Sequence, residues 1–334
     1  MTKIYEWQEI KGYFTEGIIL GNGASIAIDP RFSYSSIFEN AKASGLITSE
    51  IEKVFNHLNS EDFELVLRML WHTHNINLAL EVKDNVTSKV YGDLRSALIK
   101  AVRDIHILYD QVIVVLPDIA TFLSQFDTVI SLNYDFLVYW AILLANDKWN
   151  QTWFKDCFIE GKFDSNCEKY REPRHPAEGS TLVFYPHGNL VLANDLYGDE
   201  LKLIRGEYSN LIDTIMSCWE SGKYSPLFVS EGTAEQKLHA IYRSFYLSTV
   251  YESILPVLGS NIVIYGWSIS KPDKHILDAL REGKINKIAF SVLKNRPNIE
   301  QKCVEIENKL KYSLNNENIE VLFFYAEGAE CWIH

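Results

Sequence analysis

Three short, largely apolar runs near the end of the chain, Ile262-Val-Ile-Tyr265, Lys287-Ile-Ala-Phe-Ser-Val292 and Glu320-Val-Leu-Phe-Phe-Tyr325, indicate the fold. The stretches that separate them, residues 273–281 and 299–314, are expected to be helices. A regular alternation of strand and helix predicts parallel strands joined by helical crossovers. The runs show no alternation of apolar and polar residues, so we expect helices to cover both faces of the sheet.

Further strand-like runs lie upstream of this stretch. Residues 17–20, 128–132 and 182–185 are short and apolar, and residues 190–193 and 226–230 are similar. Together with the C-terminal alternation they predict an α/β fold, a Rossmann-like parallel sheet flanked by helices. We expect a single domain over residues 1–334.

Two stretches interrupt this pattern. Over residues 36–126, apolar side chains recur every three or four positions, which predicts a helical insertion. We expect one of its helices to begin with Ser60 as the N-cap. Residues 148–180 are aromatic, charged and rich in turn formers, which predicts an irregular insertion. Two longer helices are expected over residues 199–220 and 233–257.

Composition limits the classes of function. The formal net charge of −12 argues against direct contact with nucleic acid, because such binding depends on Lys and Arg. No stretch approaches the ~20 apolar residues of a membrane-spanning helix, so no membrane contact is expected. The N-terminus lacks the apolar core of a signal peptide. The five cysteines form no CxxC pair, which favours reduced thiols and a cytoplasmic location.

Four turns that follow strand-like runs are the candidate functional segments. Carboxyl ends of parallel strands meet at one edge of a sheet, so these turns predict a single dinucleotide pocket. A Gly-x-Gly turn lets backbone amides approach a pyrophosphate, and the alternative is a tight turn without a ligand. The segments are Gly21-Asn22-Gly23-Ala24-Ser25, Ser131-Leu-Asn133-Tyr-Asp135, His187-Gly188 and Gly266-Trp-Ser268.

Each polar residue in these turns also has a purely structural interpretation. Asn133 and Asp135 are candidates for chemistry, but either could cap the helix that follows. His187 is a candidate base or a hydrogen-bonded residue of a turn. Ser270 or Asp273 could serve only as a helix cap.

Several other chemistries find no support in the residue pattern. The third glycine and the ribose-binding acid of a dehydrogenase fingerprint are missing. His72 and His74 are two residues apart, on different sides of a helix, and are interpreted as structural. Glu231, in the fifth strand-to-turn segment, is expected in a solvated turn.

The order of the four segments resembles the motifs of the sirtuin-like NAD-consuming superfamily, namely Gly-Ala-Gly-x-Ser, Thr-Gln-Asn-x-Asp, His-Gly and Gly-Thr-Ser. The chain is more similar to bacterial sirtuin-like proteins of phage defence, including the AbiH type, than to sirtuins themselves; Gly-Asn-Gly and Asn-Tyr-Asp are typical of those proteins. This resemblance covers residues 17–334.

The resemblance implies a role for each matching residue. Asn133 would contact the ribose and position a water, Asp135 would bind the nicotinamide carboxamide, and His187 would act as general base. The NAD phosphates would be held by the loop Gly21, Asn22, Gly23, Ala24 and Ser25, and the adenosine end by Gly266 and Ser268.

Departures from the sirtuin pattern narrow the implied function. The four-cysteine zinc module is absent, and Ile28-Asp-Pro-Arg-Phe-Ser-Tyr34 replaces Gly-Ile-Pro-Asp-Phe-Arg. Protein deacylation is therefore not expected, nor are zinc or another cofactor. The sequence predicts an NAD⁺ glycohydrolase of anti-phage defence, controlled by homo-oligomerisation or a partner protein. The alternatives are a non-catalytic nucleotide or ADP-ribose sensor and a scaffold subunit of a defence complex.

Overall fold

A parallel sheet forms the centre of the molecule. The computed structural model describes residues 3–33, 37–148, 152–195, 197–203, 211–229, 232–328 and 330–333. Among these residues, eight parallel strands pair in the order β1-β13-β12-β11-β2-β3-β7-β4. The fold is Rossmann-like α/β, which confirms the class predicted from the apolar runs. The strands are β1 (Ile4–Tyr5), β2 (Gly17–Leu20), β3 (Thr128–Ser131), β4 (Thr152–Lys155), β7 (Gly179–Phe184), β11 (Asn261–Tyr265), β12 (Lys287–Val292) and β13 (Glu320–Tyr325).

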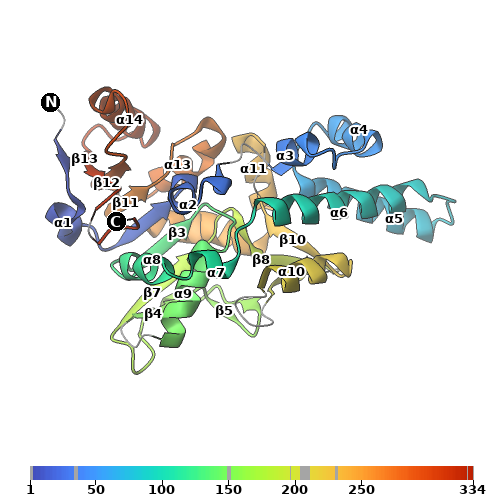
Figure 1. The fold of residues 1–334 in the computed structure, drawn as a ribbon, viewed down its shortest axis with the longest axis horizontal. Helices are drawn as coiled ribbons and strands as arrows, with labels where there is room; N and C mark the ends of the chain where they lie inside the picture. Colours follow the sequence, from blue (N-terminus) through green and yellow to red (C-terminus); the bar gives the residue numbers. More distant parts are fainter. Residues whose placement is uncertain are drawn as a thin grey trace.

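Helices cover both faces of this sheet (Figure 1). From β2 the chain moves through β3 to β7 in one direction, and from β11 through β12 to β13 in the other. Because such crossovers are right-handed, the two directions place their helices on opposite faces. One face therefore carries α8 (Leu116–Leu123) and α9 (Leu137–Lys148), and the other carries α13 (Lys274–Arg281) and α14 (Ile299–Ser313).

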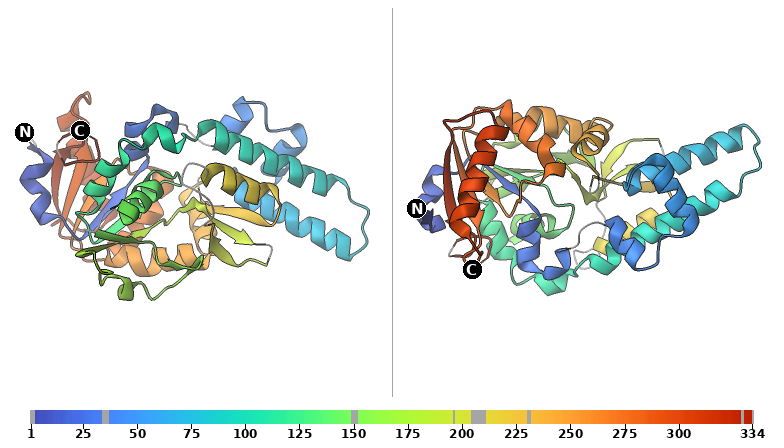
Figure 2. Two further views of the ribbon diagram at one scale, coloured as in Figure 1. Left: turned by 60° about the horizontal axis from the view of Figure 1, so that its bottom comes forward. Right: turned by 90° about the horizontal axis from the view of Figure 1, so that it is seen from above.

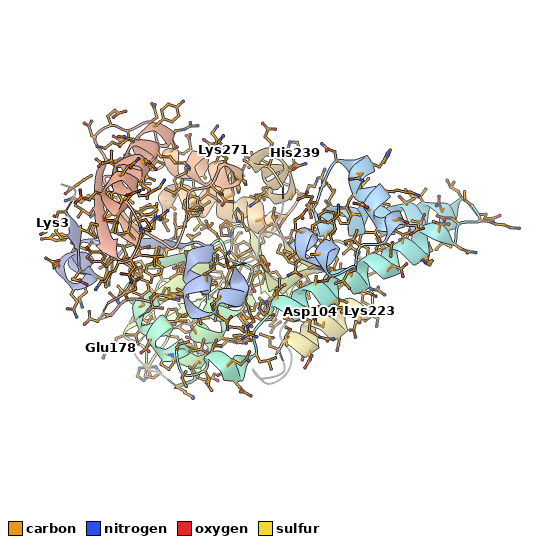
Figure 3. The ribbon with its side chains drawn as sticks, turned by 45° about the horizontal axis from the view of Figure 1, so that its top comes forward. Lys3, Asp104, Glu178, Lys223, His239 and Lys271 are labelled. Atoms are coloured by element: carbon orange, nitrogen blue, oxygen red, sulfur yellow. The ribbon has the colours of Figure 1, made fainter. Side chains whose placement is uncertain are left out.

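The helical insertion predicted over residues 36–126 lies between β2 and β3. It consists of α3 (Ile37–Ala43), α4 (Ser49–Leu58), α5 (Phe63–Ala79), α6 (Val86–Ile105), α7 (Tyr109–Val112) and α8. Helices α5 and α6 form a long arm that leaves the body of the molecule (Figures 1 and 2). Figure 3 shows the arm with its side chains, extending from the region where Asp104 and Lys223 are labelled.

The expected start of one insertion helix was wrong by two residues. Asp62, not Ser60, is the N-cap of α5, and its carboxylate accepts a hydrogen bond of 3.1 Å from the Leu65 amide. Ser60 instead accepts a hydrogen bond from the amide of Asp62. Aspartate and serine both fit this position, so composition alone could not choose between them.

Within the described residues, no single helix has the length and apolar content needed to cross a membrane. By length and composition alone, the bent pair Val86–Val112 and Leu116–Leu123 passes that test.

The stretch predicted as irregular, residues 148–180, contains regular structure that patterning missed. Strand β4 adds to the edge of the main sheet beside β7, and β5 (Phe158–Ile159) pairs with β6 (Lys162–Phe163) in a hairpin. Because an edge strand is only partly buried, Thr152–Lys155 shows no continuous apolar run.

A second, three-stranded antiparallel sheet lies beside the main one. It pairs β8 (Gly188–Asp195) with β9 (Glu200–Lys202) and with β10 (Tyr224–Phe228). The helix expected over 199–220 is therefore shorter. It is α10 (Leu211–Glu220), and residues 204–210 lie outside the described part of the chain.

The long helix expected over 233–257 is broken. It consists of α11 (Ala234–Ile241) and α12 (Phe245–Thr249), followed by a π-turn and a 3₁₀-turn that end at Val257. The hydroxyl of Ser244 accepts a hydrogen bond of 3.0 Å from the Leu247 amide and so starts α12 afresh.

Replacement of Gly188 by alanine is expected to destabilise the fold by about 3 kcal/mol. Gly188 has a φ of +74°, and a Cβ there would lie 2.2 Å from the carbonyl oxygen of Leu227. Urea unfolding measures the effect. The control is Gly92→Ala in α6, where a Cβ meets open space and stability should rise by about 0.5–1 kcal/mol. Equal stability of the two variants would contradict this account of Gly188.

Candidate functional site

The four segments meet in one cavity of about 800 Å³ at the carboxyl edge of the sheet. This is the point at which the chain reverses its direction across the sheet, between β2 and its neighbours β3 and β11. Ala24 and Ser25 are buried and do not line the cavity. The candidate residues that line it are Gly21, Asn22, Gly23, Asn133, Asp135, His187, Gly266 and Ser268.

The glycines pack one turn directly against another. The Gly21 amide donates to the Tyr265 carbonyl at 2.9 Å, and the Gly23 amide donates to the Gly266 carbonyl at 2.7 Å. A Cβ on Gly21 would lie 2.4 Å from the Cα of Trp267, and one on Gly266 would lie 2.3 Å from the Ala24 nitrogen. These glycines thus have a packing role, and the two amides expected to meet a pyrophosphate already have backbone partners.

Asn133 joins the turn after β2 to the turn after β3. Its side-chain amide donates to the Gly21 carbonyl at 3.1 Å and to the Ser25 hydroxyl at 2.9 Å. Because a carbonyl oxygen can only accept, the Asn133 Nδ2 must face Gly21. This orientation leaves Oδ1 of a cavity-lining residue, 7% exposed, without a partner among the described residues. It can accept a hydrogen bond from a ligand hydroxyl or a water.

Asp135 belongs to the same hydrogen-bond network as Asn133 and Ser25. One carboxylate oxygen accepts from the Ser25 hydroxyl at 2.5 Å, and the other accepts from the Leu137 amide at 2.9 Å at the start of α9. Burial raises the pKa of Asp135, while the bonds from Ser25 and Leu137 oppose that rise. Asp135 therefore has a structural role as the acceptor for the first amide of α9. Its role toward a nicotinamide carboxamide stays a prediction.

His187 is paired with a second histidine that sequence reasoning missed. The Nε2 atoms of His187 and His275 lie 2.8 Å apart, and the two residues are 4% and 2% exposed. Burial lowers the pKa of His187 well below 6.5, and the nearby charge of Lys237 lowers it further. Burial and Lys237 also lower the pKa of His275 to about 4. Both rings are therefore neutral at pH 7.

An ion pair between Lys237 and Asp273 also lines the cavity, at 2.8 Å. Lys237 comes from α11, and Asp273 directly precedes α13. Burial raises the pKa of Asp273, but interactions with His187 and Lys237 and a bond from Ser270 outweigh burial, so this pKa lies below 3.8. We assign the main stabilising charge to Lys237, because His187 is neutral at pH 7.

The capping interpretation of Ser270 and Asp273 was wrong. Neither side chain caps a helix; instead the Ser270 hydroxyl donates to the Asp273 carboxylate at 2.9 Å. The position of Asp273 after a strand end was a usable signal. Lys237 lies in an ordinary helical pattern and gave no such signal.

Charged residues surround the mouth of the cavity. Glu39 and Glu61 reach it from the helical insertion, and Arg296 reaches it from the segment between β12 and α14. Gly232 also lines it, whereas the predicted solvated residue Glu231 lies outside the described residues. Across the described ranges, no three His, Cys, Asp or Glu residues are grouped to hold a metal ion.

A known protein family matches nearly the whole of this fold. Residues 18–332 match the model of a family described as a domain of unknown function, DUF4917. The chain belongs to the DUF4917 family. The matched region of this DUF4917 protein contains every cavity residue named above. A search of the curated proteins found no match.

Replacement of Asp273 by asparagine is expected to cost about 3 kcal/mol at pH 7, because Lys237 is left buried without its partner. A lowered carboxyl pKa stabilises the fold above the unfolded value of 3.8 and ceases to do so as pH falls through the folded value. The difference between wild type and variant should therefore shrink below about pH 3.8. Chemical unfolding over a pH series measures it.

The double variant Lys237→Met/Asp273→Asn is the control for this pair. Removal of both charges should restore most of the lost stability, because no unpaired buried charge remains. Strictly additive losses in the two single variants would show that the pair is not coupled.

Proposed function

We propose that this DUF4917 protein is an NAD⁺ glycohydrolase, which uses water to cleave the nicotinamide–ribose bond and releases nicotinamide and ADP-ribose. The observation that supports this most strongly is the convergence of Asn133 and His187, from two different strand ends, in one cavity at the switch point of the sheet. The cavity volume of about 800 Å³ falls in the range of small-molecule and cofactor sites.

The charges of the cavity suit a ligand with a cationic ring and anionic phosphates. Lys237 uses one donor on Asp273, and its ammonium group has further N–H donors for a phosphate oxygen. Arg296 adds a second cation at the mouth. The ionised Asp273 and the acids Glu39 and Glu61 favour the positive charge of nicotinamide and of the ribosyl cation that forms as it leaves.

The proposed reaction needs an oriented water and a base. Asn133 Oδ1 accepts a hydrogen bond from the attacking water or a ribose hydroxyl. Nicotinamide leaves with the electron pair of the broken C–N bond, through an oxocarbenium-like state as in glycoside hydrolysis. The water oxygen bonds to the anomeric carbon, and its proton passes to neutral His187.

The resemblance to defence proteins supports a biological setting. We propose that the activity depletes NAD⁺ during phage infection in the cytoplasm, and that homo-oligomerisation or a regulatory partner keeps it inactive before infection.

A second candidate is a sensor that binds NAD⁺ or ADP-ribose without turnover. Two contacts favour it: His187 Nε2 faces His275, and both carboxylate oxygens of Asp135 have protein partners. In this function the same residues would shape the cavity and perform no chemistry.

Asn133→Ala and His187→Ala are each expected to lower the rate of NAD⁺ loss by at least about 100-fold, because one positions the water and the other accepts its proton. The assay measures nicotinamide release by the purified protein, and calorimetry with ADP-ribose measures binding, which should persist. His239→Ala, an exposed histidine of α11 labelled in Figure 3, is the matched control. Binding without turnover in the wild type, with candidate triggers present, would favour the sensor.

In cells, NAD⁺ is expected to fall after phage infection when the wild type is expressed and to remain constant with His187→Ala. The measurement is NAD⁺ quantification with and without phage. Protection from phage at constant NAD⁺ would contradict the depletion mechanism.

A further inference from the structure

The contact between His187 and His275 points to a second histidine in the proton transfer. We propose that His275 is a positioning residue that forms one proton-accepting pair with His187, in which His187 borders the cavity and His275 lies behind it. The proposal deepens the cleavage reaction above and rests on it.

The two rings share their ring protons as a unit. Two neutral imidazoles carry two N–H protons on four nitrogens. The 2.8 Å contact between the Nε2 atoms joins two of these nitrogens and holds one proton. The other proton sits on one Nδ1, so the second Nδ1 is bare. In either tautomer one nitrogen is bare, but a proton from the cavity can reach it only when it is Nδ1 of His187, because Nδ1 of His275 is buried.

The pair can take up one proton from the attacking water in a balanced step. When the bare nitrogen is Nδ1 of His187, the proton of the attacking water binds there, and the pair changes from neutral to singly positive. The shared proton can then move across the contact from His187 to His275, which carries the positive charge away from the cavity side. In this tautomer the proton of neutral His275 sits on its buried Nδ1, so its Nε2 can accept the shared proton.

Charged residues around the pair affect its protonation in both directions. Lys237 of α11 opposes protonation of both rings, while Asp273 favours it. Asp278 of α13 also favours the charged form of His275, and the Tyr251 ring lies 6.3 Å from the His275 ring. One net positive charge on the pair is therefore favoured by Asp273 and Asp278 and opposed by Lys237.

His275→Gln separates positioning from simple packing. A glutamine amide can still hydrogen-bond to His187 but cannot take up a proton. We expect kcat to fall about 100-fold with KM little changed, and the same fall in His275→Phe, which fills the space without a hydrogen bond. His239→Gln on α11 is the matched control. Wild-type kcat in His275→Gln would overturn the proposal, because hydrogen bonding alone would then suffice.

Side-chain NMR of ¹⁵N-histidine-labelled protein tests the pair without any turnover. On acidification, the ring nitrogens of His187 and His275 should shift together in one step, and in His275→Gln the His187 step should move in pH. Two independent steps, or a His187 step unchanged in His275→Gln, would overturn the proposal. A joint step with no NAD⁺ cleavage by any variant would instead show that the proposed activity is wrong.

Discussion

The close contact between the turns after β2 and β11 is the constraint on which the rest of the site depends. The Gly23 amide reaches the Gly266 carbonyl at 2.7 Å only because neither turn carries a side chain at the contact. This approach builds one wall of the cavity from backbone. It also presents the Gly21 carbonyl to Asn133, whose amide then has only one possible orientation. A packing requirement of the sheet thus determines which atom of Asn133 is left for a ligand.

Buried polar groups around that contact are satisfied in pairs. Ser25 links Asn133 to Asp135, His187 faces His275, and Lys237 neutralises Asp273. Because an unpaired buried charge is costly, each pairing also determines which residue can change its protonation state. Asp135 and Asp273 already have such partners, and we therefore propose the neutral histidine pair as the group that accepts a proton. A preformed cavity of this kind requires little rearrangement before a ligand binds.

Much of the fold and part of the site could be predicted because their causes are local. The apolar runs of β2, β3, β11 and β12 are buried over nearly their whole length, and β13 is buried at Phe323 and Phe324, so composition alone marks these strands. Strand β4 escaped prediction because an edge strand needs less apolar sequence. The break in the helix expected over 233–257 escaped prediction, because the apolar pattern continues through Ser244, where the cap starts a new helix.

By itself, the sequence determined that parallel strands form one Rossmann-like sheet and that four polar turns follow them, since strand formation and turn chemistry depend on neighbours in the chain. Only the tertiary structure decided which atoms of those turns have partners. His275 and Lys237 are 88 and 50 residues from His187 along the chain, and no local pattern marks them. Their positions follow from the crossovers that bring α11 and α13 to the carboxyl edge of the sheet, where short-range hydrogen bonds and charge interactions act between distant segments.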